Sequence, residues 1–176
     1  MHRLFVAIRP PETIREQLLD LMEGVPDLRW QQDEQLHLTL RFIGEVERPV
    51  AEDVAAALDR IRADRFDLSL HGVGKFEKRR HGALWAGVQP TDALKGLNAK
   101  VERACQSAGL EPERRAFHPH ITLARWKGNA AGLDRFLEGH GGLSSDPWEV
   151  GEFVLYESRL GREGAHYEPV ERYRLS

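Results

Sequence analysis

A four-residue pattern of histidine, apolar residue, threonine and apolar residue occurs twice in this chain, and its side chains could carry out acid–base chemistry. The two copies are His37-Leu38-Thr39-Leu40 and His120-Ile121-Thr122-Leu123. Because side chains alternate between the faces of a β-strand, each histidine shares a face with its own threonine, and the apolar residues point into the core. Two such strands face to face would bring two imidazoles to one site. One imidazole could protonate a leaving group while the other deprotonates a nucleophile near neutral pH.

The residues around the two motifs indicate contacts with a phosphorylated ligand. Arg125 lies five residues after His120, where a guanidinium either clamps a phosphate with two hydrogen bonds or marks a solvated strand end. Arg41 and Phe42 follow the first motif, and Phe42 either stacks on a base or packs in the core. We expect these three side chains to bind substrate. The threonine hydroxyls either donate to phosphate and orient the imidazoles, or reflect β-propensity alone.

His118 offers a third imidazole next to the second motif. A metal site built from His37, His118 and His120 is therefore an alternative use of these histidines. No Asp or Glu lies within the motif to complete such a site, and Pro119 makes the backbone there irregular. Cys105 is the only cysteine, which excludes an internal disulfide and a thiolate metal site. We expect chemistry without a metal or another cofactor.

One short segment, residues 75–81, is strongly basic, with the sequence Lys-Phe-Glu-Lys-Arg-Arg-His. It lies between two expected strands, so a solvated hairpin loop is the simpler interpretation. The alternative is a lip that attracts RNA phosphates, helped by Arg114 and Arg115.

The overall composition is that of a soluble globular protein. The chain has 176 residues, is 41% hydrophobic and 30% charged, and carries a formal net charge of −3. This charge excludes a general polyanion binder, so any contact with nucleic acid should come from a local patch. The N-terminal apolar run is too short for a signal peptide, and no run approaches the roughly 20 apolar residues of a membrane span. We expect a cytoplasmic monomer that does not bind membranes.

The order of the expected elements repeats along the chain. The first half predicts a strand at 4–8, a helix from residue 14, the first motif strand, and a helix from about 49 to 61. The second half predicts a strand at 84–88, a helix from 91 to 105 with Thr91 as its N-cap, the second motif strand, and a helix at 133–137. Further strands are expected at 66–73, 148–156 and 167–175.

This duplication predicts an α+β fold with two lobes related by a pseudo-twofold axis. Tight turns between the expected strands favour mainly antiparallel sheets, flanked by the helices and separated by a central cleft. Residues 1–176 are expected to form a single bilobal domain. No glycine fingerprint of the Rossmann or P-loop type is present.

Paired motifs in a duplicated α+β chain resemble the two-histidine (2H) phosphoesterase superfamily. Within it, the chain is similar to the bacterial and archaeal RNA 2′,3′-cyclic phosphodiesterases, also called the 2′-5′ RNA ligase family. The segments that carry the resemblance are 3–8, 37–46, 84–88, 117–125 and 157–160.

The resemblance implies the 2H phosphoesterase fold and hydrolysis of a 2′,3′-cyclic phosphate at an RNA 3′ end to a 2′-phosphate, without a metal. It implies that His37 is the proton donor and His120 the proton acceptor, whereas the residues alone leave the reverse assignment open. Thr39, Thr122 and Arg125 would meet the charge that builds on the phosphoryl oxygens. The expected partner is RNA with a cyclic phosphate end or a small cyclic nucleotide.

Two alternatives of other classes remain open. One is an enzyme of the same superfamily that joins 2′-5′ RNA ends or opens a cyclic phosphate of ADP-ribose. The other is a non-catalytic module that binds RNA ends. Two intact histidine–threonine pairs argue against the module, because binding alone needs no pair of titrating groups.

Overall fold

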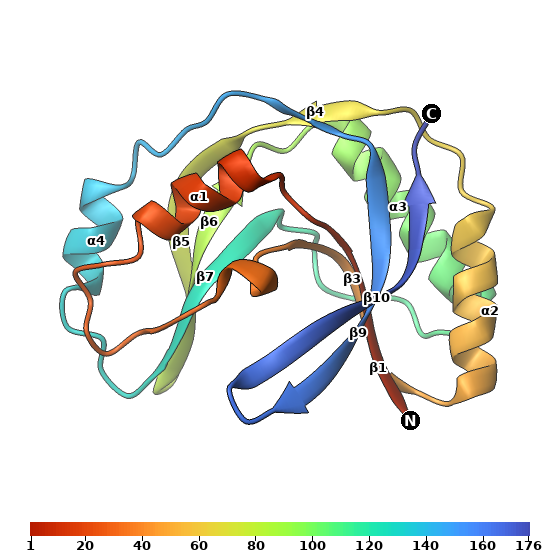
Figure 1. Ribbon diagram of the computed structural model, residues 1–176, viewed down its shortest axis with the longest axis horizontal. Coiled ribbons are helices and arrows are strands. Elements are labelled where there is room, and N and C mark those ends of the chain that lie inside the picture. The colour runs from red at the N-terminus through yellow and green to blue at the C-terminus, as the bar shows by residue number, and fades with distance from the viewer.

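The computed structural model covers residues 1–176 and contains the two similar halves that the sequence predicts (Figure 1). The elements of the first half are β1 (His2–Ile8), α1 (Glu12–Asp20), β3 (Leu38–Val46) and α2 (Arg48–Asp59). Those of the second half are β6 (His81–Val88), α3 (Asp92–Ser107), β7 (His120–Lys127) and α4 (Leu133–Gly139). The predicted N-cap is confirmed, because the Thr91 hydroxyl accepts a hydrogen bond of 3.1 Å from the Leu94 amide.

Three of the remaining strands extend these halves into one antiparallel sheet, and the other two form a small separate sheet. They are β4 (Phe66–Leu68), β5 (Leu70–Lys78), β8 (Trp148–Val150), β9 (Glu152–Gly161) and β10 (Gly164–Arg174). Two short elements that the sequence did not predict precede the first motif: β2 (Arg29–Trp30) and the 3₁₀ helix η1 (Asp33–Gln35). The large sheet has the order β10-β9-β1-β3-β7-β6-β5, with β2 paired to β7, while β4 and β8 form a separate pair.

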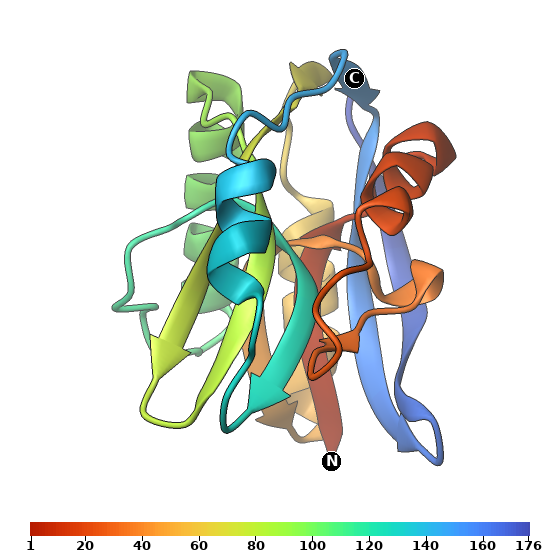
Figure 2. The ribbon, with the colours of Figure 1, turned by 90° about the vertical axis from the view of Figure 1, so that its left-hand side faces the viewer.

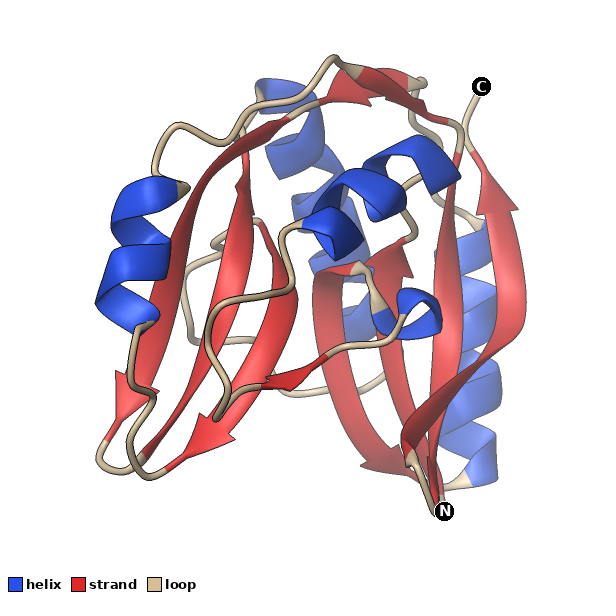
Figure 3. Cartoon of the chain, turned by 60° about the vertical axis from the view of Figure 1, so that its left-hand side comes forward, coloured by secondary structure: helices blue, strands red, loops and turns tan.

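The large sheet consists of two half-sheets that meet along a narrow seam. The first half-sheet is β10-β9-β1-β3, and the second is β7-β6-β5 with β2. Across the seam, β3 and β7 pair at one position only, Leu38 with Ile121. Figure 3 shows the two half-sheets as separate groups of strands that diverge from each other. The α+β fold with two lobes and antiparallel sheets is therefore confirmed.

A hydrophobic core of 36 buried residues runs through both halves. The helices α2 and α3 pack together and cover one face of the first half-sheet (Figure 1). Figure 2 shows α4 in front of the second half-sheet, where Phe136 packs against Trp30 at 5.8 Å between ring centroids. Because the helices cover these faces, the motif side chains are left on the opposite, uncovered faces.

Two expected elements differ from the structure. The strand expected at 66–73 is divided into β4 and the start of β5, which belong to different sheets. The basic segment 75–81 is mostly paired strand rather than a solvated loop, because Lys75 to Lys78 pair with Leu84 to His81. Only Arg79 and Arg80 form the turn, with Arg79 at a φ of 59°. No helix is long and apolar enough to cross a membrane.

Candidate active site

The two motifs lie on either side of the seam between the half-sheets. His37 immediately precedes β3, and His120 is the first residue of β7. The paired residues Leu38 and Ile121 are buried, and antiparallel pairing at this position sets His37 opposite Thr122 and Thr39 opposite His120. Thr39 and His120, one from each motif, line the same cavity.

A backbone hydrogen bond orients each imidazole in the same way. Nδ1 of His37 donates to the Gln35 carbonyl oxygen at 2.7 Å, and Nδ1 of His120 donates to the His118 carbonyl oxygen at 2.6 Å. Because a carbonyl oxygen only accepts, each Nδ1 carries a proton. Nε2 is the nitrogen of each ring that remains for a ligand.

Aromatic side chains hold each histidine within its own half-sheet. The ring of His37 lies 4.8 Å from Phe5 and 5.2 Å from Tyr167, measured between centroids. The ring of His120 lies 5.0 Å from Phe76 and 5.9 Å from Trp85. Sequence reasoning did not identify these four aromatic residues as parts of the site. The internal repeat contained a signal, because Phe5 and Trp85 occupy equivalent places 80 residues apart.

Burial disfavours the charged form of both imidazoles. Burial is the main cause that lowers the pKa of His37 to about 4, and the positive charges of His120, Arg9 and Arg125 add to it. The hydrogen bond to Gln35 partly opposes this shift. Burial also lowers the pKa of His120, the hydrogen bond to the His118 carbonyl partly opposes this shift, and the positive charges of His118 and Arg125 add to it. Both imidazoles are therefore mainly neutral at pH 7 in the free protein, and a bound anion would favour their protonation.

A β-bulge in β7 brings Arg125 to the same face as His120. Trp85 of β6 pairs with Thr122, and Leu84 pairs with Ala124, so Leu123 has no partner. Without this extra residue, alternation would place Arg125 on the face opposite Thr122. With the bulge, the exposed guanidinium of Arg125 lies on the face of the sheet that carries the motif histidines, here called the site face.

A matching β-bulge in β3 places Phe42 on the site face and Arg41 on the opposite face. Ala7 of β1 pairs with Thr39 and Val6 pairs with Arg41, so Leu40 has no partner. Phe42 then pairs with Phe5 on the site face, where it is 39% exposed. The guanidinium of Arg3 lies 5.1 Å from its ring. Phe42 is thus available to a ligand, as expected for a base-stacking residue.

Arg41 lies on the opposite face of β3 and is only 8% exposed. Its Nε donates to Glu102 of α3 at 2.6 Å, and its other two nitrogens donate to the carbonyl oxygens of Phe42 and Glu111. All three guanidinium nitrogens of Arg41 thus have protein partners, although Arg41 also lines the cavity beside Thr39 and His120, so its contact with substrate stays a prediction. The bulge at Leu40 turns the side chain toward α3, where it connects β3 to that helix and to the loop that follows it.

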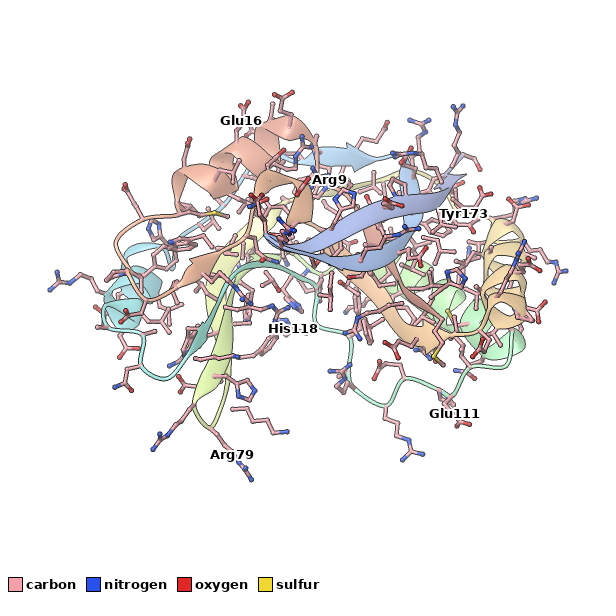
Figure 4. All side chains as sticks on the ribbon, turned by 60° about the horizontal axis from the view of Figure 1, so that its bottom comes forward. Arg9, Glu16, Arg79, Glu111, His118 and Tyr173 are labelled. Carbon is pink, nitrogen blue, oxygen red and sulfur yellow. The ribbon has the colours of Figure 1, made fainter.

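A cavity of about 420 Å³ opens beside Thr39 and His120. Phe42 and Phe76 contribute apolar walls, and two ion pairs, Arg41 with Glu102 and Arg115 with Glu113, also line the cavity. This volume is in the range of small-molecule sites. Figure 4 shows His118, another lining residue, near the middle of the molecule between the two lobes.

His118 contributes its carbonyl group to the orientation of His120, while its ring lies 4.8 Å from Trp85 and 5.7 Å from the His120 ring. No group of three or more His, Cys, Asp or Glu side chains is arranged to hold a metal ion. His37 and His118 therefore do not form the three-histidine cluster weighed as an alternative.

Gln35 supports the first motif, and sequence reasoning missed it. Its carbonyl oxygen accepts from His37, and its Nε2 donates to the Ala165 carbonyl of β10 at 2.9 Å. Gln32 and Gln35 also form a capping box around η1. Arg9 holds the same turn by donating to the carbonyl oxygens of Asp33 and Leu36 at 2.7 Å each. The Gln-x-x-Gln spacing was the one available signal for this turn.

Comparisons with known proteins agree with the geometry. Residues 5–162 match a family model described as the 2′-5′ RNA ligase superfamily. A protein of Aeropyrum pernix named RNA 2′,3′-cyclic phosphodiesterase is 40% identical over 151 residues, which cover 84% of this chain and 85% of that protein. An Escherichia coli protein of the same name is 33% identical over 178 residues, covering 99% and 97% of the two chains. The crystal structure of E. coli LigT complexed with 3′-AMP has a TM-score of 0.82 and 32% identity, and it covers 99% of this chain and 98% of that one.

Proposed function

Because this chain belongs to the 2′-5′ RNA ligase superfamily, we propose that it is a hydrolase that opens 2′,3′-cyclic phosphates at RNA 3′ ends to leave a 2′-phosphate. The names of the A. pernix and E. coli relatives support this activity. The observation that carries the proposal is the pair of imidazoles, one on each side of the seam, whose Nδ1 atoms are both occupied by backbone carbonyls. Two free Nε2 atoms are what a paired acid and base require.

The reaction needs two proton transfers, one to each side of the phosphorus. Water attacks the phosphorus as Nε2 of His120 takes a proton from it. The bond between phosphorus and O3′ breaks, and Nε2 of His37 gives its proton to the departing O3′. Each transfer is typically worth about 10²- to 10⁴-fold in rate. Because burial keeps His37 neutral in the free protein, the negative charge of the bound phosphate has to stabilise its proton.

The remaining site residues bind the phosphate and the base. The hydroxyls of Thr39 and Thr122 and the guanidinium of Arg125 lie on the site face, where they stabilise charge on the non-bridging oxygens. The exposed ring of Phe42 offers a stacking surface at the mouth of the neighbouring cavity.

The substrate partner is RNA with a cyclic phosphate end, and the existence of a crystal structure of LigT complexed with 3′-AMP supports a nucleotide ligand. We infer that residues 1–176 fold as one bilobal domain, since the core of 36 residues draws on both halves. Both motifs come from one chain, so a cytoplasmic monomer would have a complete site. Light scattering would test the monomer, and a single unfolding transition would test the domain.

Turnover of a dinucleotide that ends in a 2′,3′-cyclic phosphate tests the function directly. We expect a 2′-phosphate product, formed equally well with and without EDTA, and none from a variant that lacks both His37 and His120. Absence of turnover would reject the activity. A 3′-phosphate product would reverse the assignment of the leaving oxygen, and activity that depended on added metal would reject the two-histidine mechanism.

A further inference from the structure

Beyond the motif, the site face of the second half-sheet carries cations and no acid. Strand pairing places Arg125 beside Ala83, and Lys127 beside His81, which in turn pairs with Lys78. Arg29 of β2 pairs with Arg125 from the other side. Together with the turn at the hairpin tip, these residues form a surface that we call the basic strip: Arg29, Lys78, Arg79, Arg80, Arg125 and Lys127.

No residue of the basic strip forms an ion pair, although Arg79 and Arg80 at the hairpin tip also line a pocket of about 450 Å³ that contains Glu77 and Asp134. All six side chains of the strip are exposed. The hairpin of the other lobe differs, because Arg159 there lies within 3.6 Å of Glu157 and 3.5 Å of Glu168. Glu77 lies on the other face of β5, since it pairs with Gly82, a neighbour of His81 in β6.

This concentration of positive charge is unusual for a chain whose net charge is −3. Arg29 and Arg125 lie directly opposite each other across β2 and β7, and like charges in that position destabilise a sheet. An anion bound over the pair would remove this repulsion. The distribution of charge therefore favours an anionic ligand over this face.

The basic strip extends away from the reacting phosphate. It begins at Arg125, and the five steps along the strand from Thr122 to Lys127 correspond to about 17 Å. Figure 4 shows Arg79 at the tip of the β5–β6 hairpin, far from His118 in the centre. A mononucleotide held between the two histidines would not reach the tip, whereas a polymer with a charge on every nucleotide would.

We propose that the basic strip binds the sugar–phosphate backbone of single-stranded RNA, upstream of the cyclic phosphate end. This inference rests on the proposed function and adds the surface that selects an RNA chain over a small cyclic nucleotide. Backbone contacts of this kind depend on charge rather than on sequence, so they extend the binding site without base preference.

The test compares a dinucleotide with a 12-nucleotide RNA, both ending in a 2′,3′-cyclic phosphate, at several salt concentrations. The test variant combines Lys78→Ser, Arg80→Ser and Lys127→Ser, which leaves Arg125 and the strained Arg79 turn untouched. We expect the protein to prefer the longer RNA by tenfold or more in kcat/KM at low salt, and the variant to lose this preference. Its turnover of the dinucleotide should not change. The slope of log affinity against log salt should fall by about 0.7 for each cation removed.

A second cluster of basic side chains, lining a pocket without acidic residues, supplies the matched control for the triple variant. Arg60, Arg62 and Arg103 line a pocket of about 330 Å³ between α2 and α3. Their combined replacement by serine removes the same charge and should leave both substrates unaffected. If this control variant lost the length preference equally, net charge rather than the basic strip would be responsible, and the proposal would be overturned.

Binding of a 12-nucleotide RNA with a 2′-phosphate end separates this inference from the proposed function. Its affinity is measured without turnover, and it should fall in the test variant only. If the protein turned over the dinucleotide normally but the test variant bound the 12-nucleotide RNA with unchanged affinity, the proposed role of the basic strip would be overturned and the proposed activity would stand. If the protein did not turn over the dinucleotide but the test variant lost affinity for the 12-nucleotide RNA as expected, the proposed activity would be overturned and the role of the basic strip would stand.

Discussion

Leu40 and Leu123 occupy the same place in the two halves, and each is the unpaired residue of a β-bulge. Each is the last residue of its motif, three positions after the histidine. Leu40 is passed over in the pairing of β1 with β3, and Leu123 in the pairing of β6 with β7. The bulges bring the residue five positions after each histidine, Phe42 and Arg125, back to the site face. In the proposed function, one lobe would thereby contribute a ring for the base and the other a cation for the phosphate.

Removing either motif histidine should abolish most of the activity. We expect His37→Ala and His120→Ala each to lower kcat/KM by on the order of 10² or more, because each removes one proton transfer. His118→Ala is the matched control and should keep most activity, since His120 bonds to its backbone carbonyl rather than to its ring. Thr39→Val and Thr122→Val should cost less than the histidine variants, about 1.5–3 kcal/mol each. Steady-state kinetics on folded variants measures these effects, and near-normal turnover by either histidine variant would exclude that residue.

The pH dependence of kcat/KM should be bell-shaped, with its maximum on the acid side of the ordinary histidine pKa of 6.5. The pKa of His37 is lowered to about 4 and that of His120 is also lowered, so the protonated acid is lost early as pH rises. The kcat profile should lie at higher pH, because bound phosphate favours imidazolium. The two limbs belong to the coupled pair. A kcat/KM that continued to rise above neutrality would contradict this mechanism.

The two arginines near the motifs should respond differently to substitution. Arg125→Ala should lower kcat/KM by about 10²-fold through loss of phosphate stabilisation, with little change in unfolding free energy, because its side chain is exposed. Arg41→Ala should instead lower the unfolding free energy by about 3 kcal/mol, because Glu102 loses its buried partner. Urea unfolding and kinetics on both variants measure the contrast. A stable Arg41→Ala protein with a raised KM would assign Arg41 to the substrate site.

Phe42 should act on substrate affinity rather than on stability. Base stacking on an aromatic ring is worth about 1–3 kcal/mol, so Phe42→Ala should raise KM for a nucleotide substrate roughly tenfold and leave kcat nearly unchanged. Phe42→Tyr keeps the ring and should keep the affinity. Because Phe42 is 39% exposed, the unfolding free energy should change little. Lost stability with an unchanged KM would assign the ring to core packing.

The sequence alone determined the features that depend on local pattern. The spacing of His37 and Thr39, and of His120 and Thr122, predicted the motif strands, because alternation on a strand is a property of consecutive residues. The order of helices and strands and the Thr91 cap followed from equally local signals. The repeated order of elements then predicted two lobes, because two halves with the same pattern of apolar residues should fold in the same way.

Only the tertiary structure decided which neighbours of the motifs share the site. A bulge is defined by the pairing of two strands, so nothing within residues 37–42 reveals that Leu40 would be passed over by β1. Because Leu40 is unpaired, the side chain of Arg41 points toward α3 and bonds to Glu102, whereas Phe42 lines the cavity. The aromatic neighbours of each histidine and the pairing of Arg29 with Arg125 could not be predicted either, because these residues come from strands far apart in sequence. The local sequence pattern determines which side chains lie on the same face of a strand. The pairing between strands that are distant in sequence determines which side chains come into contact at the site.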